Sequence, residues 1–204
     1  MVHKTFRSTL LIILLFLGCS LARAATELSE PQLIVKEAAE RLQAAMKENP
    51  PSGNYERASG IVTEILDPHV DFVRISALVL AKHWKRATLE QKKRFMKEFK
   101  ALMVRTYAVA FSEYSDWEIE HLPIKMGPND DKVFVKTAVL RPGASPIEVN
   151  YRMIYRKGVW KVYDVVIEGI SFVSNYRTTF KNDIARTGSL EDVIQRLANH
   201  NNKK

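Results

Sequence analysis

The sequence predicts an α+β fold in which a four-stranded, or slightly larger, antiparallel sheet has helices packed over one face. Apolar residues recur at spacings of three and four up to residue 114, alternate with polar residues between 117 and 167, and return to helical spacing after Gly169. No internal repeat and no linker rich in Pro, Gly or Ser interrupts this order. We therefore expect one domain over residues 25–204.

The first 24 residues have the composition of a cleaved signal peptide. Lys4 and Arg7 precede an uncharged apolar run at 10–17, and Ala-Arg-Ala at 22–24 supplies the small residues at which signal peptidase cuts. A run of 8 apolar residues is too short to cross about 30 Å of hydrocarbon as a helix, which argues against a retained anchor. The segment therefore predicts export.

Cys19 leaves a narrower alternative, which is lipoprotein processing at the sequence LFLGC. Phe16 stands where such a motif usually has Leu, and a good cleavage site follows, so cleavage after Ala24 is favoured. That cleavage removes the only cysteine, and the exported chain must then be held together by its hydrophobic core.

Removal of the signal peptide lowers the formal net charge from +8 to about +5. A mildly basic exported protein can attract anionic membrane surfaces or acidic partners, although ordinary solubility explains the charge equally well. The basic residues are dispersed along the chain, which together with export disfavours nucleic acid as a partner.

Helices are expected wherever the apolar spacing is helical and a capping residue precedes it. Asp71, Thr88 and Ser189 are such caps, and Gln91 completes a capping box with Thr88. The expected helices run from 30 to Pro50, over 55–66, from 71 towards 84, and over 89–114, 170–185 and 190–199. The apolar face of the long helix at 89–114 is wider than contact with one neighbour requires.

Strands are expected over 117–121, 133–139, 147–156 and 159–167, with a tight hairpin at Lys157 and Gly158. The last strand is unusual because strict alternation leaves neither of its faces polar. Val159, Tyr163, Val165 and Ile167 would lie on one face, with Trp160, Val162 and Val166 on the other. Both faces must then be covered, by protein or by a ligand.

The chain lacks the sequence signatures of common catalytic and metal sites: it has no nucleophile elbow, phosphate-binding glycine loop, HExxH sequence or cysteine pair. The segment 67–71 (Asp-Pro-His-Val-Asp) carries three potential metal ligands, but a helix break followed by a cap explains it better. We therefore expect neither a metal site nor a cofactor.

Two segments carry a resemblance to a known family, namely Asp71–Tyr107 and Tyr151–Phe180. Both resemble the toluene-tolerance or Mla-type family of periplasmic phospholipid-binding proteins, and the most specific part is YDV followed by EGIS at 163–171. The resemblance covers essentially the whole exported chain. One departure is Ala81, where the family more often has glycine.

The resemblance implies a soluble periplasmic phospholipid carrier without catalysis, which holds acyl chains in an apolar cavity between sheet and helices. It implies transfer of lipid between an inner-membrane ABC transporter complex with its MCE-domain component and an outer-membrane lipoprotein–porin complex. Such a system maintains the lipid asymmetry of the outer membrane. Bound phospholipid would then be cargo rather than a cofactor.

The resemblance and the apolar patterning together suggest a set of cavity-lining residues. These are Phe72, Ile75, Phe99, Met103, Tyr107, Val149, Tyr151, Met153, Val165, Ile167, Phe172, Val173 and Tyr176. Arg152 or Arg177 could contact the phosphate of the head group. Broad apolar faces can also simply fill one another, so the sequence alone does not establish a cavity.

A different class of function stays open at this point. A small exported enzyme could use Asp164 as an acid–base group, with a histidine or tyrosine as its partner. That function requires Asp164 to lie in a pocket, within hydrogen-bond reach of the partner.

Overall fold

The computed structural model describes residues 27–48, 55–113 and 117–202, and the predicted signal peptide lies outside these ranges. Its helices are α1 (Glu30–Glu48), α2 (Tyr55–Leu66), α3 (Phe72–Leu80), α4 (Lys82–Arg86), α5 (Leu89–Glu113), α6 (Phe172–Thr187) and α7 (Leu190–Asn201), with a short 3₁₀ turn, η1 (Asp67–His69), before α3. This order confirms the helical pattern expected from the sequence. No described helix is both long enough and apolar enough to cross a membrane.

The described strands all lie between α5 and α6 along the chain. Its strands are β1 (Glu118–His121), β2 (Lys132–Val135), β3 (Thr137–Leu140), β4 (Ile147–Arg156), β5 (Val159–Ile167) and β6 (Ile170–Ser171). Neighbours pair antiparallel in the order β1-β3-β4-β5-β6, and β2 pairs with the far half of β4. The α+β class with an antiparallel sheet is thus confirmed.

The strand expected at 133–139 is two strands, because the chain changes partner at Lys136. β2 pairs with the Tyr151–Ile154 part of β4, whereas β3 pairs with β1 and with the start of β4. β6 was also not expected as a strand. It pairs with the end of β5 across a turn in which Glu168 (φ 48°) and Gly169 (φ 77°) both have positive φ.

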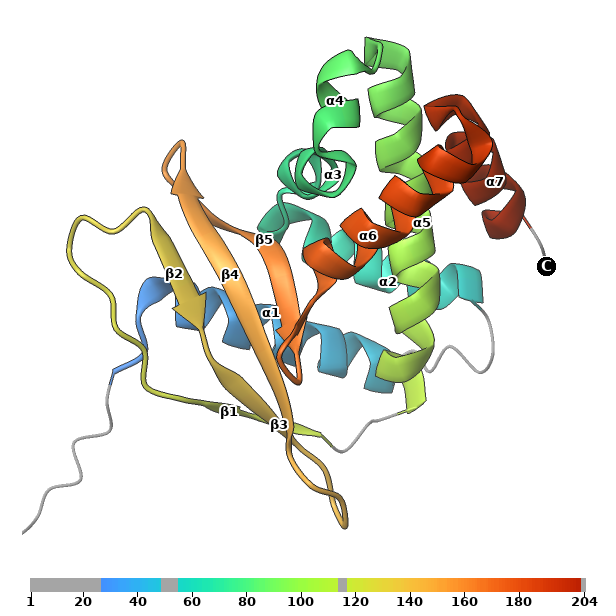
Figure 1. The fold of residues 1–204 in the computed structure, drawn as a ribbon. Helices are drawn as coiled ribbons and strands as arrows, with labels where there is room; N and C mark the ends of the chain where they lie inside the picture. The colour runs from blue at the N-terminus through green and yellow to red at the C-terminus, as the bar shows by residue number, and fades with distance from the viewer. Residues whose placement is uncertain (1–26, 49–54, 114–116, 203–204) are drawn as a thin grey trace, which may run out of the picture.

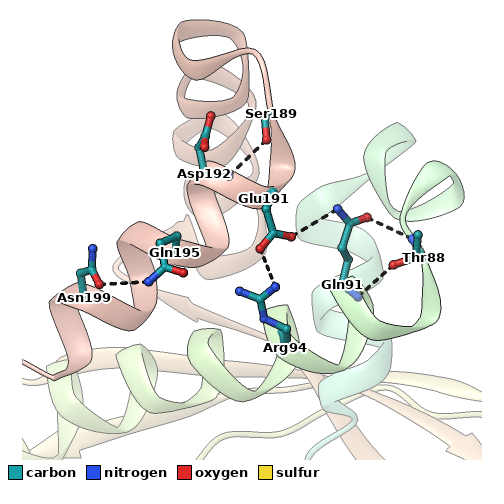
Figure 2. Close-up of polar contacts among 8 residues, drawn as sticks. All are labelled: Thr88, Gln91, Arg94, Ser189, Glu191, Asp192, Gln195 and Asn199. Carbon is teal, nitrogen blue, oxygen red and sulfur yellow. Dashed lines mark hydrogen bonds and ion pairs between the residues drawn. The ribbon is translucent and has the colours of Figure 1, made fainter.

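The predicted caps form at the starts of three helices. Asp71 Oδ1 accepts from the backbone N–H of Arg74 at 2.9 Å, which begins α3. At the start of α5, Thr88 and Gln91 exchange side-chain and backbone hydrogen bonds, each of 3.1 Å. Ser189 caps α7, as Figure 2 shows beside the capping box of α5.

Figure 2 also shows how the last helix is fastened to the longest one. Glu191 accepts from Arg94 Nη1 at 2.5 Å and from Gln91 Nε2 at 3.4 Å. The carboxylate lies in the first turn of α7, where the helix dipole also favours negative charge. We call this group, Gln91, Arg94 and Glu191, the α5–α7 clasp.

The helix expected from 71 towards 84 breaks at Ala81, between α3 and α4. Ala81 has φ 48° and ψ −116°, a backbone conformation that an L-residue with a Cβ adopts only at a cost. Glycine would adopt it freely, which gives a physical reason for the glycine that the resembled family more often has here.

Strict alternation along β5 was wrong, because the pairing with β4 shifts register between Arg152 and Met153. Arg152 pairs with Asp164 but Met153 pairs with Val162, so Tyr163 is the extra residue of a bulge. Beyond the bulge the faces exchange. Trp160 and Val162 therefore lie on the same face as Val165 and Ile167.

The buried apolar residues form three clusters. The first, which we call the helical core, joins α3, α5, α6 and α7 around Phe95, Phe99 and Phe180. A second joins α1, α2 and α5, and the third joins α1 to the sheet. Figure 1 shows this arrangement, with α1 crossing behind the sheet and α5, α6 and α7 gathered to one side of it.

Candidate functional site

All of the sheet residues expected to line a cavity share one face. Tyr151 pairs with Val165, Val149 pairs with Ile167, and Met153 follows Tyr151 by two positions along β4. Residues directly opposite on antiparallel strands, and alternate residues along a strand, point to the same side of a sheet. This is the side that α1 covers through Ile34 and Val35.

Burial is uneven along that face, and Tyr155 at one end of it is exposed. Met153 (0% exposed), Trp160 and Val162 are buried beneath α1, together with Val133 and Val135 of β2. By contrast, Val149, Tyr151, Val165 and Ile167 are only half-buried, although they are apolar and belong to the inner side of the central strands. We call these four residues the sheet wall.

Tyr151 shows that the sheet wall is not ordinary outer surface. Burial raises the pKa of Tyr151 to about 12, while a side-chain hydrogen bond with Thr137 acts in the opposite direction. Its side chain nevertheless keeps some accessible surface. The surrounding protein thus desolvates the phenol of Tyr151 although the residue as a whole is only half-buried.

The helical residues expected in the same lining are packed mostly into the helical core. Ile75, Met103 and Val173 are buried there, and Phe99 is 0% exposed. The ring of Phe99 stacks edge-on against Tyr176, with centroids 5.2 Å apart. In this structure the helical residues therefore fill one another to a greater extent than the residues of the sheet wall do.

Phe172, Tyr176 and Phe72 keep partial exposure. The rings of Phe172 and Tyr176 lie 4.7 Å apart at the edge of the helical core. Phe72, in the first turn of α3, has the Lys100 amino group 5.4 Å from its ring centroid. The side chain of Tyr107 lies outside the described residues.

Val70 connects the helical core to the cluster between α1 and the sheet, and the sequence analysis did not identify it. It packs against both the helical core and the cluster between α1 and the sheet, and it bridges to Val162 of β5. The backbone N–H of the next residue, Asp71, donates to the Val162 carbonyl at 2.9 Å. A signal was present, because an apolar residue just before a cap often packs against the fourth residue of the helix, here Ile75.

Asp164 lies on the opposite face of the sheet from Tyr151 and is 2% exposed. It accepts from Ser171 Oγ at 2.7 Å and from the backbone N–H of Val173 at 2.9 Å. Its carboxylate thus fastens the first turn of α6 to β5. Among the described residues its hydrogen bonds include none to a histidine or tyrosine, and they support a structural role for Asp164.

The two arginines considered for the head group lie apart from the sheet wall. Arg152 of β4 pairs with Asp164 of β5, and both lie on the face of the sheet opposite to the sheet wall. The Nη1 atom of Arg152 is 3.4 Å from Oδ2 of Asp164. Arg177 of α6 donates from Nε to the Leu78 carbonyl of α3 at 2.7 Å. Arg152 follows Tyr151 in the chain but lies on the opposite face of the sheet, and Arg177 belongs to α6, so the assignment of either residue to the head group stays a prediction.

The segment 67–71 is the turn and cap that the sequence favoured. Residues 67–69 form η1, and Asp71 caps α3. Burial, and after it the positive charge of Arg41, lowers the pKa of His69. Within the described ranges no group of three or more acidic, His or Cys side chains is arranged to hold a metal.

The sequence matches the MlaC protein family over residues 36–199, from within α1 to within α7. The chain belongs to the MlaC family. The match includes the sheet wall, the helical core and the turn that joins β5 to α6.

Relatives of this MlaC-family chain carry names from the same system. It is 29% identical to the intermembrane phospholipid transport system binding protein MlaC of Haemophilus influenzae over 170 residues, which are 78% of this chain and 76% of the relative. It is 30% identical to the toluene tolerance protein ttg2D of Pseudomonas putida over 129 residues, 63% of this chain and 60% of the relative.

A solved structure with the same fold has a lipid in it. The phospholipid-binding protein from Ralstonia solanacearum, determined in complex with a phospholipid, superposes with a TM-score of 0.80 at 28% identity. The match covers 85% of this chain and 97% of that protein. Helices, sheet and connections of the MlaC-family chain are therefore those of a phospholipid-binding fold.

Proposed function

We propose that this MlaC-family protein is a periplasmic phospholipid carrier of the Mla system, with the acyl chains of its cargo held against the sheet wall. The observation that carries the proposal is the close superposition on a protein solved with phospholipid bound. The half-buried inner face formed by Val149, Tyr151, Val165 and Ile167 supports the same location for the tails. The head group would lie near solvent at the open end of that face.

The carrier would be exported by a signal peptide cleaved after Ala24 and would act in the periplasm. Its partners would be an inner-membrane ABC transporter complex with its MCE-domain component and an outer-membrane lipoprotein–porin complex. Exchange of lipid between these complexes would help to maintain outer-membrane lipid asymmetry. Names of relatives in the intermembrane phospholipid transport system support this proposal.

The energetics of such a site suit a carrier. Removal of acyl chains from water is favourable by about 0.8 kcal/mol per methylene, so two long tails represent roughly 25 kcal/mol of gross driving force. Measured non-covalent affinities saturate near −18 to −21 kcal/mol, because ordering and association costs offset the rest. Relative to a bilayer most of this term cancels, since the tails pass between two dry environments. The protein should therefore exchange lipid with membrane complexes while releasing little into water.

The function of a small exported enzyme has less support. It would need Asp164 to be available to a substrate beside a histidine or tyrosine, whereas its carboxylate is buried and bonded to Ser171 and Val173. These contacts favour a role in holding α6.

The test is mass spectrometry of protein purified without detergent. We expect phospholipid to be recovered from the native protein, at a constant ratio to protein from one preparation to the next. Repeated recovery of none would contradict the proposal.

A charge placed in the sheet wall should remove the lipid. Val149→Asp puts a carboxylate against the acyl chains, where an unpaired charge is strongly unfavourable, so the bound lipid should fall to background. Val159→Asp is the matched control, because Val159 lies on β5 but is 48% exposed, and it should keep its lipid. Folding of both variants is checked by circular dichroism, and unchanged lipid in a folded Val149→Asp variant would show that Val149 does not line the site.

A further inference from the structure

A pocket lies away from the sheet wall, between the α3–α4 corner and α6. It has a volume of about 350 Å³, and its residues are Val79, Leu80, Ala81, Lys82, His83, Arg177, Phe180, Lys181 and Ile184. Val79, Leu80, Phe180 and Ile184 are buried and make an apolar floor. We call it the corner pocket.

The polar groups that line the corner pocket are all basic. Lys82 and His83 come from α4, and Arg177 and Lys181 lie four positions apart on α6. Burial lowers the pKa of His83, and the charges of Lys82 and Arg86 lower it further. The imidazole thus responds to a positive local field, as expected when no carboxylate is among the lining residues.

One of these cations is fixed in place. Arg177 Nε donates to the Leu78 carbonyl at 2.7 Å, which ties the guanidinium to the end of α3. Among the described residues, neither Arg177 nor the neighbouring Lys82 and Lys181 forms a salt bridge with an acidic side chain. Arg177 is exposed, and a guanidinium that is oriented by one hydrogen bond and not paired with acids can bind a carboxylate or a phosphate through its remaining donors.

We propose that the corner pocket binds a single-chain amphipathic anion, with its chain on the apolar floor and its carboxylate or phosphate at Arg177 and Lys181. Volume limits the ligand, because about 350 Å³ is near the lower end of the roughly 300–1,000 Å³ typical of small-molecule sites. The pocket therefore accepts one chain rather than the two tails of a phospholipid. A free fatty acid and a lysophospholipid share this chemistry and differ in the head group.

The site is independent of the proposed carrier site. Its floor belongs to the helical core, and none of its residues is part of the sheet wall. Methyl groups report on the two places separately, since Val79, Leu80 and Ile184 line the corner pocket whereas Val149, Val165 and Ile167 form the sheet wall.

The experiment is methyl NMR of the full exported chain, purified with whatever lipid it carries and titrated with decanoate or decyl phosphate. We expect saturable shifts of the methyl groups of Val79, Leu80 and Ile184. The double variant Arg177→Gln, Lys181→Gln should weaken the binding by about tenfold or more, because it removes the charge-assisted hydrogen bonds to the head group. Lys93→Gln with Lys97→Gln on the exposed side of α5 is the matched control and should bind as the native protein does.

Comparison of the affinities of decanoate and decyl phosphate identifies the preferred head group. Decanol, which has the same chain without a charge, tests whether binding needs the negative charge. Three results would overturn the proposal: shifts confined to the sheet wall, equal binding of decanol, or no effect of the double variant. Loss of binding to anionic vesicles in the double variant, without methyl shifts from the soluble probes, would assign the basic residues to a membrane surface and also overturn it. Shifts that persist in Val149→Asp protein would show that the corner pocket works whether or not the carrier proposal holds.

Discussion

The helical core and the sheet wall are built from similar residues but are filled to different degrees. In the helical core, Phe95 and Phe99 are both 0% exposed and their rings contact each other and Phe180. Along the sheet wall, Val149 and Val165 remain half-buried although they lie on the inner face of the two longest strands. One region is completed by its own side chains, and the other leaves apolar surface that we propose a ligand covers.

The difference teaches that apolar patterning identifies inward-facing residues but does not identify what they meet. Phe99 and Tyr151 were both expected to face lipid. Phe99 meets Phe172, Tyr176 and Phe180, so its partners are protein. Tyr151 is desolvated by the protein around it and is half-buried, so its burial does not identify a single partner.

The largest effect should come from removing a buried ring from the helical core. Phe99→Ala removes a fully buried ring, and we expect a loss of about 3–5 kcal/mol in the free energy of unfolding. Phe172→Ala is the matched comparison, because its ring lies at the half-buried edge of the same cluster and should cost clearly less. Denaturant unfolding of both variants measures this, and equal losses would show that the two rings are equally well packed.

A smaller loss of stability is expected at Asp164, which joins β5 to the start of α6. Asp164→Asn removes the charge that accepts from Ser171 Oγ and Val173 N–H, so unfolding free energy should fall by about 1.5–3 kcal/mol. Ser171→Ala, which also removes the cap on Ser174, should cost nearer about 1 kcal/mol. An unchanged Asp164→Asn midpoint in urea would mean that α6 is held mainly by its apolar contacts.

Relief of strain at the edge of the helical core should stabilise the protein slightly. Ala81 has φ 48°, and Ala81→Gly removes the Cβ that makes this conformation unfavourable. We expect the free energy of unfolding to rise by about 1 kcal/mol. The phospholipid content should not change, because Ala81 lies between α3 and α4 and lines the corner pocket, not the sheet wall. Thermal unfolding and lipid extraction test the two statements. A loss of stability would indicate that the corner between α3 and α4 needs the methyl group.

The sheet wall should also be visible in the alkaline titration of Tyr151. Its folded-state pKa of about 12 exceeds the ordinary value of 10.0, so the stability that its neutral phenol contributes is complete below pH 10 and is lost as the pH rises towards 12. The ultraviolet difference between native and Tyr151→Phe protein should show one phenol that ionises late. Ionisation near the ordinary value would indicate that solvent reaches Tyr151 freely.

Much of the fold follows from local signals in the sequence. The helix over 55–66, the caps at Asp71 and Ser189 and the capping box of Thr88 with Gln91 depend on residues close in sequence, and all of them form as expected. The hairpin at 157–158 is equally local. There the turn residues have φ 53° and 83°, which suits a two-residue connection.

Features that depend on distant residues could not be predicted in this way. The bulge at Tyr163 arises from pairing with β4, and it moved Trp160 and Val162 to the face opposite to the expected one. The break at Lys136 reflects a change of partner strand. Likewise, Met103 and Val173 are buried by packing among helices, which the periodicity of either helix does not reveal. The location of the cargo and the lining residues stay predictions.

The α5–α7 clasp has a consequence for the order in which the protein folds. Glu191 is separated from Arg94 by 97 positions and from Gln91 by 100, so the long helix acquires its last neighbour only when nearly the whole chain is present. Contacts this distant in sequence require a long loop to close before they contribute, which slows their formation. Until then the aromatic side of α5 is not covered by α6 and α7, and the growing chain exposes a large apolar surface that favours aggregation. The protein therefore depends on α7 to cover the aromatic side of α5 and so to limit aggregation.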